Sequence, residues 1–210
     1  MDKALLKQAR NLNRRNGGTN GPFPPIVLMT DDQRLPEPEC AIRALPRDSM
    51  VIFRHYDHPA RATLGAHLRA ICRTRAIPFL VANDVSLALK LDADGIHFPE
   101  YRALTDPGIY GRLTDHLLRT SACHHAHTLR RLAQLPRQSR PDGVLMSPVF
   151  PTQSHPGSAH LGLQRLSEMS QLCLTHNMQP IALGGIHGGN VGSLRTCAIA
   201  SVAGIGFSVG

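Results

Sequence analysis

The sequence predicts a closed α/β barrel of eight parallel strands surrounded by helices, the (β/α)8 or TIM barrel. Apolar runs of about four to eight residues alternate with amphipathic helical patterns along most of the 210 residues. Near-continuous apolar runs are typical of parallel strands that helices cover. Eight such runs at this spacing favour a closed barrel over an open sheet.

Two segments are expected, a helical extension at residues 1–24 and a barrel domain at residues 25–210. The extension holds a basic helical pattern, about Lys3 to Arg15, and a Gly/Asn/Pro-rich linker. The predicted strands are residues 25–32, 50–56, 77–84, 95–99, 117–124, 143–150, 180–186 and 201–207. The predicted helices between them are residues 60–75, 85–92, 127–134, 161–177 and 190–199. Since the sequence stops soon after the eighth run, the barrel is expected to lack its last helix, whose place the N-terminal helix could take.

The composition narrows the class of protein. Five cysteines are scattered without a C-x-x-C pair, which disfavours both a disulfide framework and a zinc site. No apolar run approaches the roughly 18 residues of a membrane span. The first residues lack the apolar core of a signal peptide. A cytoplasmic protein without a membrane partner is therefore expected.

The formal net charge of +8 raises the question of nucleic-acid binding. The basic residues are dispersed apart from a cluster near the start, and aromatic residues, at 4%, are too few for base-stacking platforms. We therefore expect small anionic ligands and no nucleic-acid partner.

Polar residues recur where the predicted strands end, and in barrels of this class chemistry gathers at the carboxyl ends of the strands. Glycines at the seventh end, Gly184 and Gly185, allow backbone N–H groups to approach an anion. Arg54 adds a charge-assisted donor and the loop after the sixth strand adds neutral ones. The remaining candidates at these ends are Thr30, Asp31, Asn83, Asp84, His97, His124, His125, His127, Thr152, Gln153, Ser154 and Ser208. The pattern favours a pocket for a small phosphorylated molecule.

Several of these features have a structural alternative. Asp84 precedes a helical pattern and could be its N-cap. Gly184 and Gly185 could form a simple turn. His127 could simply begin a helix, and a metal at the histidine cluster is disfavoured because no cysteine or carboxylate stands near it in the sequence.

The ordered set of motifs resembles the thiamine phosphate synthase/TenI superfamily over residues 26–208. The matching segments are Thr30-Asp31, Arg54, Asn83-Asp84, ADGIHF (93–98), SPVFPTQS (147–154), IALGGI (181–186) and AGIGFS (203–208). The resemblance implies a TIM barrel of the thiamine-biosynthesis pathway and a phosphorylated thiazole or pyrimidine as ligand.

Synthases of this superfamily join a hydroxymethylpyrimidine diphosphate to a thiazole phosphate, with Mg2+ on the diphosphate. The resemblance assigns Asp84 to the metal, but Arg102 stands where the second metal carboxylate is expected. Tyr56 and His155 stand where two lysines are expected. Losing one preorganised donor costs about 10²–10³ in rate, so these replacements disfavour the synthase reaction.

The TenI branch isomerises a thiazole carboxylate phosphate to its aromatic tautomer, and the resemblance places His127 at its histidine. We therefore expect a thiazole tautomerase, with His127 and Arg54 as catalytic residues and no required cofactor. Its predicted ligand- and phosphate-binding residues are Asn83, Thr152, Gln153, Ser154, His155, Gly184, Gly185 and Ser208.

Two alternatives stay open. A diverged synthase would use Mg2+ at Asp84, with Arg102 and His155 replacing lost charges. A non-catalytic barrel would bind the phosphorylated ligand and regulate a partner. A homo-oligomer is compatible with each of these functions.

Overall fold

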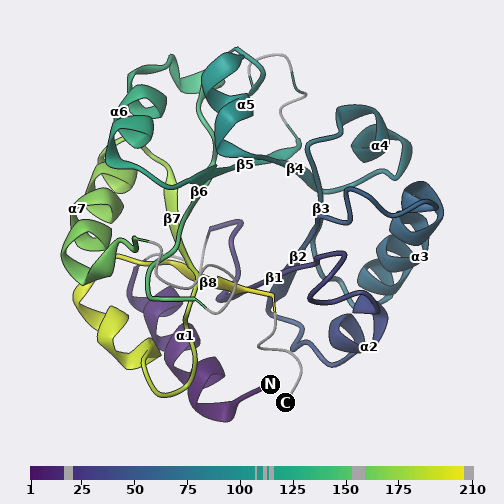
Figure 1. Ribbon diagram of the computed structural model, residues 1–210, viewed down its shortest axis with the longest axis horizontal. Helices are drawn as coiled ribbons and strands as arrows, with labels where there is room; N and C mark the ends of the chain where they lie inside the picture. Colours follow the sequence, from purple (N-terminus) through teal and green to yellow (C-terminus); the bar gives the residue numbers. More distant parts are fainter. Residues whose placement is uncertain (17–20, 107, 111–112, 114–115, 153–158, 206–210) are drawn as a thin grey trace.

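The predicted barrel is confirmed in a computed structural model that describes residues 1–16, 21–106, 108–110, 113, 116–152 and 159–205. Eight parallel strands pair in chain order, and β8 pairs with β1 to close the ring (Figure 1). The strands are β1 (Ile26–Met29), β2 (Ser49–Phe53), β3 (Phe79–Ala82), β4 (Gly95–Phe98), β5 (Leu118–Cys123), β6 (Gly143–Met146), β7 (Gln179–Leu183) and β8 (Ser201–Gly204). Most end earlier than predicted, because the polar residues that follow the apolar runs leave the ladder and form loops.

Helices surround the ring of strands (Figure 1). They are α1 (Lys3–Arg15), α2 (Pro38–Arg43), α3 (Arg61–Thr74), α4 (Val85–Lys90), α5 (Glu100–Thr105), α6 (Ala126–Gln134) and α7 (Gly162–Thr175). Short 3-10 helices are η3 (Arg137–Ser139) and η4 (Val191–Thr196). The segment predicted as a helix at residues 190–199 is thus a 3-10 turn, and α2 and α5 were not predicted.

Alternation along each strand divides the apolar side chains into two sets. One set fills the barrel interior and includes Val27, Met29, Met50, Ile52, Leu80, Leu145 and Ile181. The other set faces the helices and includes Leu28, Val51, Phe53, Phe79, Val81, Ile96 and Val144. Burying one such side chain stabilises the fold by about 1.5–3 kcal/mol. Because these side chains fill the barrel, the chemistry must lie at its ends.

Helix α1 packs against β8 and η4 on the outside of the ring (Figure 1). Its inner face buries Leu5, Ala9 and Leu12, and the Asp2 carboxylate caps its start by accepting from Ala4 N at 2.7 Å. The buried Asn13 Nδ2 donates to the Ala200 carbonyl at 2.7 Å, directly before β8. The division of the chain at residue 25 stays a prediction. No helix in the described part of the chain is long and apolar enough to cross a membrane.

Candidate functional site

A pocket of about 1030 Å³ opens at the carboxyl ends of the strands. Its walls come from the segments that follow β1, β2, β5, β6, β7 and β8. The lining includes Arg34, Arg54, His124, His125, Ser147, Thr152, Gly184, Gly185, His187, Asn190 and Gly204. Of the predicted site residues, the fold therefore brings Arg54, Thr152, Gly184 and Gly185 to one cavity.

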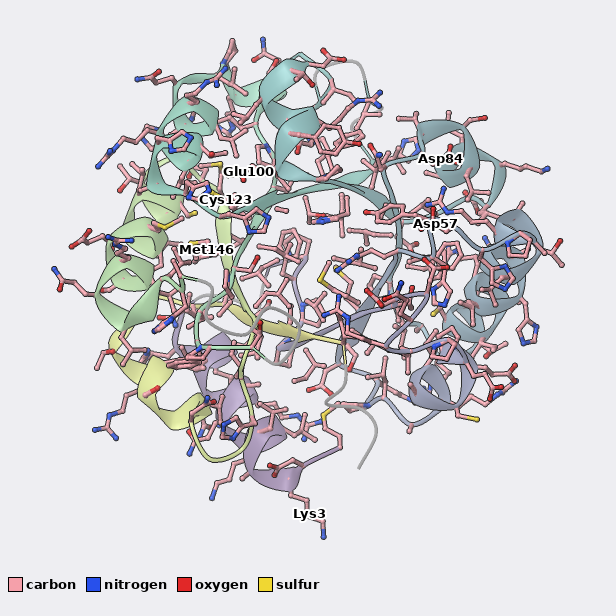
Figure 2. All side chains as sticks on the ribbon, in the orientation of Figure 1. Lys3, Asp57, Asp84, Glu100, Cys123 and Met146 are labelled. Carbon is pink, nitrogen blue, oxygen red and sulfur yellow. The ribbon has the colours of Figure 1, made fainter. Side chains whose placement is uncertain are left out.

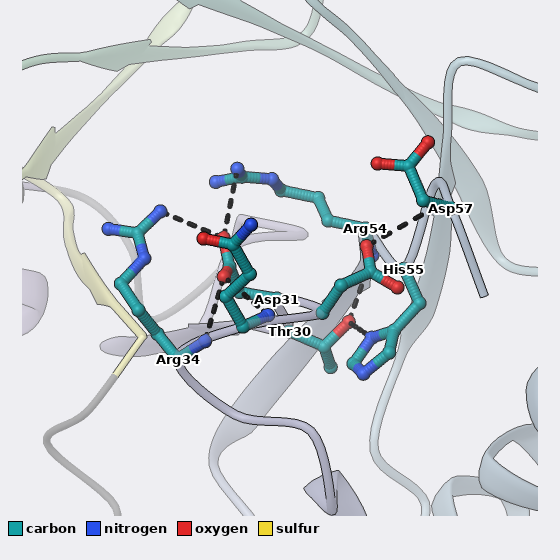
Figure 3. A network of polar contacts seen from close by, with 8 residues as sticks. Thr30, Asp31, Arg34, Arg54, His55 and Asp57 are labelled. Atoms are coloured by element: carbon teal, nitrogen blue, oxygen red, sulfur yellow. Dashed lines mark hydrogen bonds and ion pairs between the residues drawn. The ribbon is translucent and has the colours of Figure 1, made fainter.

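Two arginines on one wall are held by the same carboxylate. Arg34 Nη2 lies 2.8 Å and Arg54 Nη2 lies 3.4 Å from Asp31 Oδ2 (Figure 3). Burial raises the pKa of the Asp31 carboxyl, but hydrogen bonds from the Arg34 side chain and backbone outweigh it and hold the pKa at about 2. Asp31 is therefore ionised at neutral pH and fixes two guanidinium groups at the pocket wall.

The buried hydroxyl of Thr30 fixes the backbone of Arg54. Thr30 Oγ1 accepts from Arg54 N at 2.9 Å and lies 2.9 Å from His55 Nδ1 (Figure 3). Burial lowers the pKa of His55, which favours its neutral form. The polar residues after β1 and β2 thus form one network that aims Arg54 at the pocket.

The opposite wall contains a glycine pair with positive φ angles. Gly184 has φ +99° and Gly185 has φ +68°. A Cβ on Gly185 would lie 2.5 Å from the Pro151 carbonyl oxygen, so a larger residue would displace the loop that carries Thr152. Asn190 Nδ2 donates to the Gly185 carbonyl at 2.7 Å and fixes the turn. This close packing explains the glycines, and the wall they form also suits a phosphate group.

Two histidines that follow β5, His124 and His125, line the pocket. His124 Nδ1 lies 2.9 Å from the Ser147 carbonyl oxygen and 3.2 Å from Ser147 Oγ. Because a carbonyl oxygen accepts and cannot donate, His124 Nδ1 carries the hydrogen in this contact, which leaves Nε2 as the proton acceptor of the neutral ring. His125 lines the pocket beside it.

His127, the predicted proton shuttle, lies in the first turn of α6. Its ring stacks on the ring of His125, with centroids 5.3 Å apart and an interplanar angle of 12°. His125 and His124 line the described pocket and His127 does not. The role of His127 stays a prediction, and His124 becomes a second candidate for the same chemistry.

His97 lies within the barrel beneath these groups. It is 3% exposed, and its Nδ1 lies 3.0 Å from Thr120 Oγ1. Burial, followed by the nearby charges of Arg54 and His124, lowers the pKa of His97 to about 3. His97 is therefore neutral at neutral pH and adds no cation to the site.

Asn83 and Asp84 lie at the end of β3, apart from the lining of the pocket. Figure 2 shows Asp84 beside α4, across the ring from Met146 at the end of β6. Asp84 caps α4 by accepting from Leu87 N at 2.9 Å, as the structural alternative proposed. Asn83 Nδ2 donates to the Tyr101 hydroxyl at 3.0 Å.

The surroundings of Asp84 do not fit a Mg2+ site. Arg61 Nη1 lies 3.1 Å from Asp84 Oδ2, while Arg61 Nη2 donates to the Ala82 carbonyl at 2.7 Å. The guanidinium also lies 5.6 Å from the ring centroids of Phe53 and Tyr56. Among the described residues no three His, Cys, Asp or Glu side chains form a metal-binding group. The Arg61 guanidinium thus neutralises the carboxylate that the family resemblance assigns to the metal.

Other predicted residues lie outside the described part of the chain: Gln153, Ser154, His155 and Ser208. Their assignment to the ligand stays a prediction. Three residues that line the pocket were not predicted from the sequence: Arg34, His187 and Asn190. The signal for Arg34 was its place three residues after Asp31 in a turn, where a side-chain ion pair forms readily.

The fold and the site define a (β/α)8-barrel protein with a pocket of polar and apolar residues at the carboxyl ends of its strands. The family model described as thiamine monophosphate synthase matches residues 26–206, and the chain belongs to this family.

Individual relatives agree with this assignment. The chain is 32% identical over 149 residues to a thiamine-phosphate synthase of Levilactobacillus brevis, covering 69% of this chain and 63% of that protein. It is 28% identical over 186 residues to the thiamine biosynthesis bifunctional protein ThiED of Geobacter sulfurreducens, covering 85% of this chain and 35% of that protein. The chain thus spans less than two thirds of the length of both relatives.

Solved structures show the same fold. A thiamine phosphate pyrophosphorylase from Pyrococcus furiosus matches with a TM-score of 0.64 at 22% identity, covering 86% of this chain and 84% of that one. The citrate synthase SbnG matches with the same TM-score at 11% identity, covering 92% of this chain and 91% of that one. At these identities the likeness concerns the barrel alone.

Proposed function

We propose that the chain is a thiazole tautomerase of the thiamine pathway, acting on a thiazole carboxylate phosphate. The observation that carries the proposal is the placement of His124 and His125 in the same pocket as the glycine pair and Arg54. Asp84, the residue that the synthase reaction would need for its metal, lies apart and is paired with Arg61.

The phosphate of the ligand is assigned to the wall formed by Gly184, Gly185 and Thr152. Arg54 and Arg34 stand across the pocket, where their charges attract the anionic ligand and orient it. The Asp31 carboxylate fixes both guanidinium groups before the ligand arrives, so little ordering remains to be done on binding.

The reaction requires one proton to move from a ring carbon to the exocyclic carbon. An imidazole takes the proton from the first carbon and returns it to the second, so atoms and charge balance without an oxidant or a metal. His124 is suited to this role because its contact with the Ser147 carbonyl leaves Nε2 basic. His127 is the residue that the family resemblance favours.

A diverged thiamine-phosphate synthase is the second candidate, supported by the printed names of the relatives. The synthase reaction requires the departing diphosphate to be stabilised. Arg61 on α3 and Arg102 on α5 are cations on the side of the barrel that holds Asp84. A binding protein without turnover is the third candidate, motivated by the replaced family residues.

The test supplies the purified chain with the unaromatised thiazole carboxylate phosphate and measures thiamine phosphate by thiochrome fluorescence. In the first arm an authentic thiamine phosphate synthase and the pyrimidine diphosphate are added. Faster product formation with the chain present is the result expected of a tautomerase. In the second arm the chain is the sole protein, with and without Mg2+, and product there would instead support the synthase. No effect in either arm would leave the binding protein.

Variants then separate the two imidazoles. Removing the shuttle is expected to lower the tautomerase rate about 10²–10⁴-fold while ligand affinity is retained. His124→Asn and His127→Asn are compared with His67→Asn, an exposed histidine on α3 paired with Glu39, as the matched control. If neither His124→Asn nor His127→Asn differs from the control, proton transfer by this histidine cluster is refuted.

A further inference from the structure

A second cavity lies at the other end of the barrel. It has a volume of about 810 Å³ and lies beside α1. Its walls come from residues 21–25 before β1, from Arg47, Asp48 and Ser49 at the start of β2, and from Pro78 before β3. These residues mark the amino ends of the strands, so this groove is separate from the pocket at the carboxyl ends. The inference does not depend on the proposed function.

The groove is strongly basic. Among the described residues that line it, five are cations and one is a carboxylate: Lys3, Lys7, Arg10, Arg14, Arg47 and Asp48. The four cations of α1 recur at helical spacing, so they share one side of the helix. Lys3 extends from the start of α1 (Figure 2).

One pair in the groove is already formed. Arg10 donates to both carboxylate oxygens of Asp48, at 2.6 and 2.8 Å. Lys3, Lys7 and Arg47 form no ion pair within the described part of the chain. Three cations are thus concentrated in a concave surface without a counter-charge, which is an electrostatic focus for an anion.

Ser49, the first residue of β2, lines the groove but is fully buried, so its hydroxyl is not exposed to a ligand there. The accessible apolar wall of the groove is formed by Leu6 and Pro22.

We propose that this groove binds a small phosphate ester. The cations would hold the phosphate, and Leu6 and Pro22 would contact the body of the molecule. The volume matches that of small-molecule sites, about 300–1,000 Å³. Phe23, at 1% exposed, offers no face on which a base could stack, which argues against a nucleic-acid strand.

The test follows backbone amides by NMR during titration with phenyl phosphate and with inorganic phosphate. Shifts at Ser49 and Arg47 report the groove, and shifts at Gly184 and Gly185 report the other pocket. The expected result is a separate saturable response at the groove, with tighter binding of phenyl phosphate than of inorganic phosphate.

Variants make the assignment specific. Lys7→Gln with Arg47→Gln is expected to weaken phenyl phosphate at the groove at least tenfold and to leave the response of Gly184 unchanged. The matched control, Lys90→Gln with Arg165→Gln, removes the same charge from exposed positions on α4 and α7 and is expected to change neither response.

Three results would overturn the proposal. The first is no saturable shift at the groove amides. The second is an equal loss of binding in the control variant, which would indicate a diffuse effect of net charge. The third is tighter binding of an oligo-aspartate peptide than of phenyl phosphate at the same amides, which would assign the groove to an acidic protein segment.

Discussion

Gly185→Ala tests whether the glycine pair builds the phosphate wall. With φ +68°, an alanine at this position adopts the left-handed region at a cost of about 1–2 kcal/mol. Its Cβ would also lie 2.5 Å from the Pro151 carbonyl oxygen and 2.8 Å from Phe150 Cβ, so the loop must move. Such overpacking costs about 1–3 kcal/mol. We therefore expect the free energy of unfolding to fall by about 2–5 kcal/mol.

The assay is urea unfolding followed by circular dichroism, paired with the affinity for the thiazole phosphate ligand. Displacement of the loop should also move Thr152 from the pocket and weaken the ligand at least tenfold. Gly192→Ala is the matched control, since a Cβ there meets nothing within 4 Å and the residue needs no positive φ. A Gly185→Ala protein with the stability and ligand affinity of the control would refute the proposed role of this wall.

Two further predictions concern His97 and Asp84. The pKa of His97 is about 3 in the folded chain and about 6.5 in the unfolded chain, so between these values the unfolded chain binds the additional proton. The contribution of neutral His97 to stability is fully present above pH 6.5, and lowering the pH to 5 should reduce the free energy of unfolding by about 2 kcal/mol. His97→Gln should make the free energy of unfolding, measured by urea unfolding at each pH, less dependent on pH in this range. An unchanged slope would contradict the buried neutral imidazole. Asp84→Asn removes the Arg61 ion pair and alters the cap of α4, so we expect a loss of about 1 kcal/mol without loss of tautomerase rate. Chelation by EDTA should likewise leave that rate unchanged, whereas a Mg2+-dependent condensation that Asp84→Asn abolishes would contradict the proposal.

Most strands could be predicted because their apolar runs are buried on both sides. Val51 faces the helices while its neighbour Ile52 faces the interior, so both must be apolar and the run is continuous. Helices α2 and α5 have six residues each, too few to establish a helical period, and escaped prediction, whereas α4, of the same length, was predicted after the N-cap signal of Asp84. Pro38 at the start of α2 was the available signal, since proline is favoured in the first turn of a helix.

The site was predicted in part, and the reason lies in the geometry of strand ends. Arg54 and Gly184 follow their strands directly, so the barrel topology brings them to the same mouth. Arg34 and Asn190 lie in turns several residues beyond the strands, and their directions depend on side-chain contacts that no periodicity encodes. His124 directly follows β5 and was among the strand-end candidates, but its contact with Ser147, a residue 23 positions away, could not be predicted from periodicity.

The residues around Asp84 that differ from the family pattern are physically consistent with one another. Tyr56 stands where a lysine is expected, and the Arg61 guanidinium lies between its ring and that of Phe53 while pairing with Asp84. A diphosphate bound with Mg2+ needs a free carboxylate, and a carboxylate fixed to an arginine is poorly suited to that role.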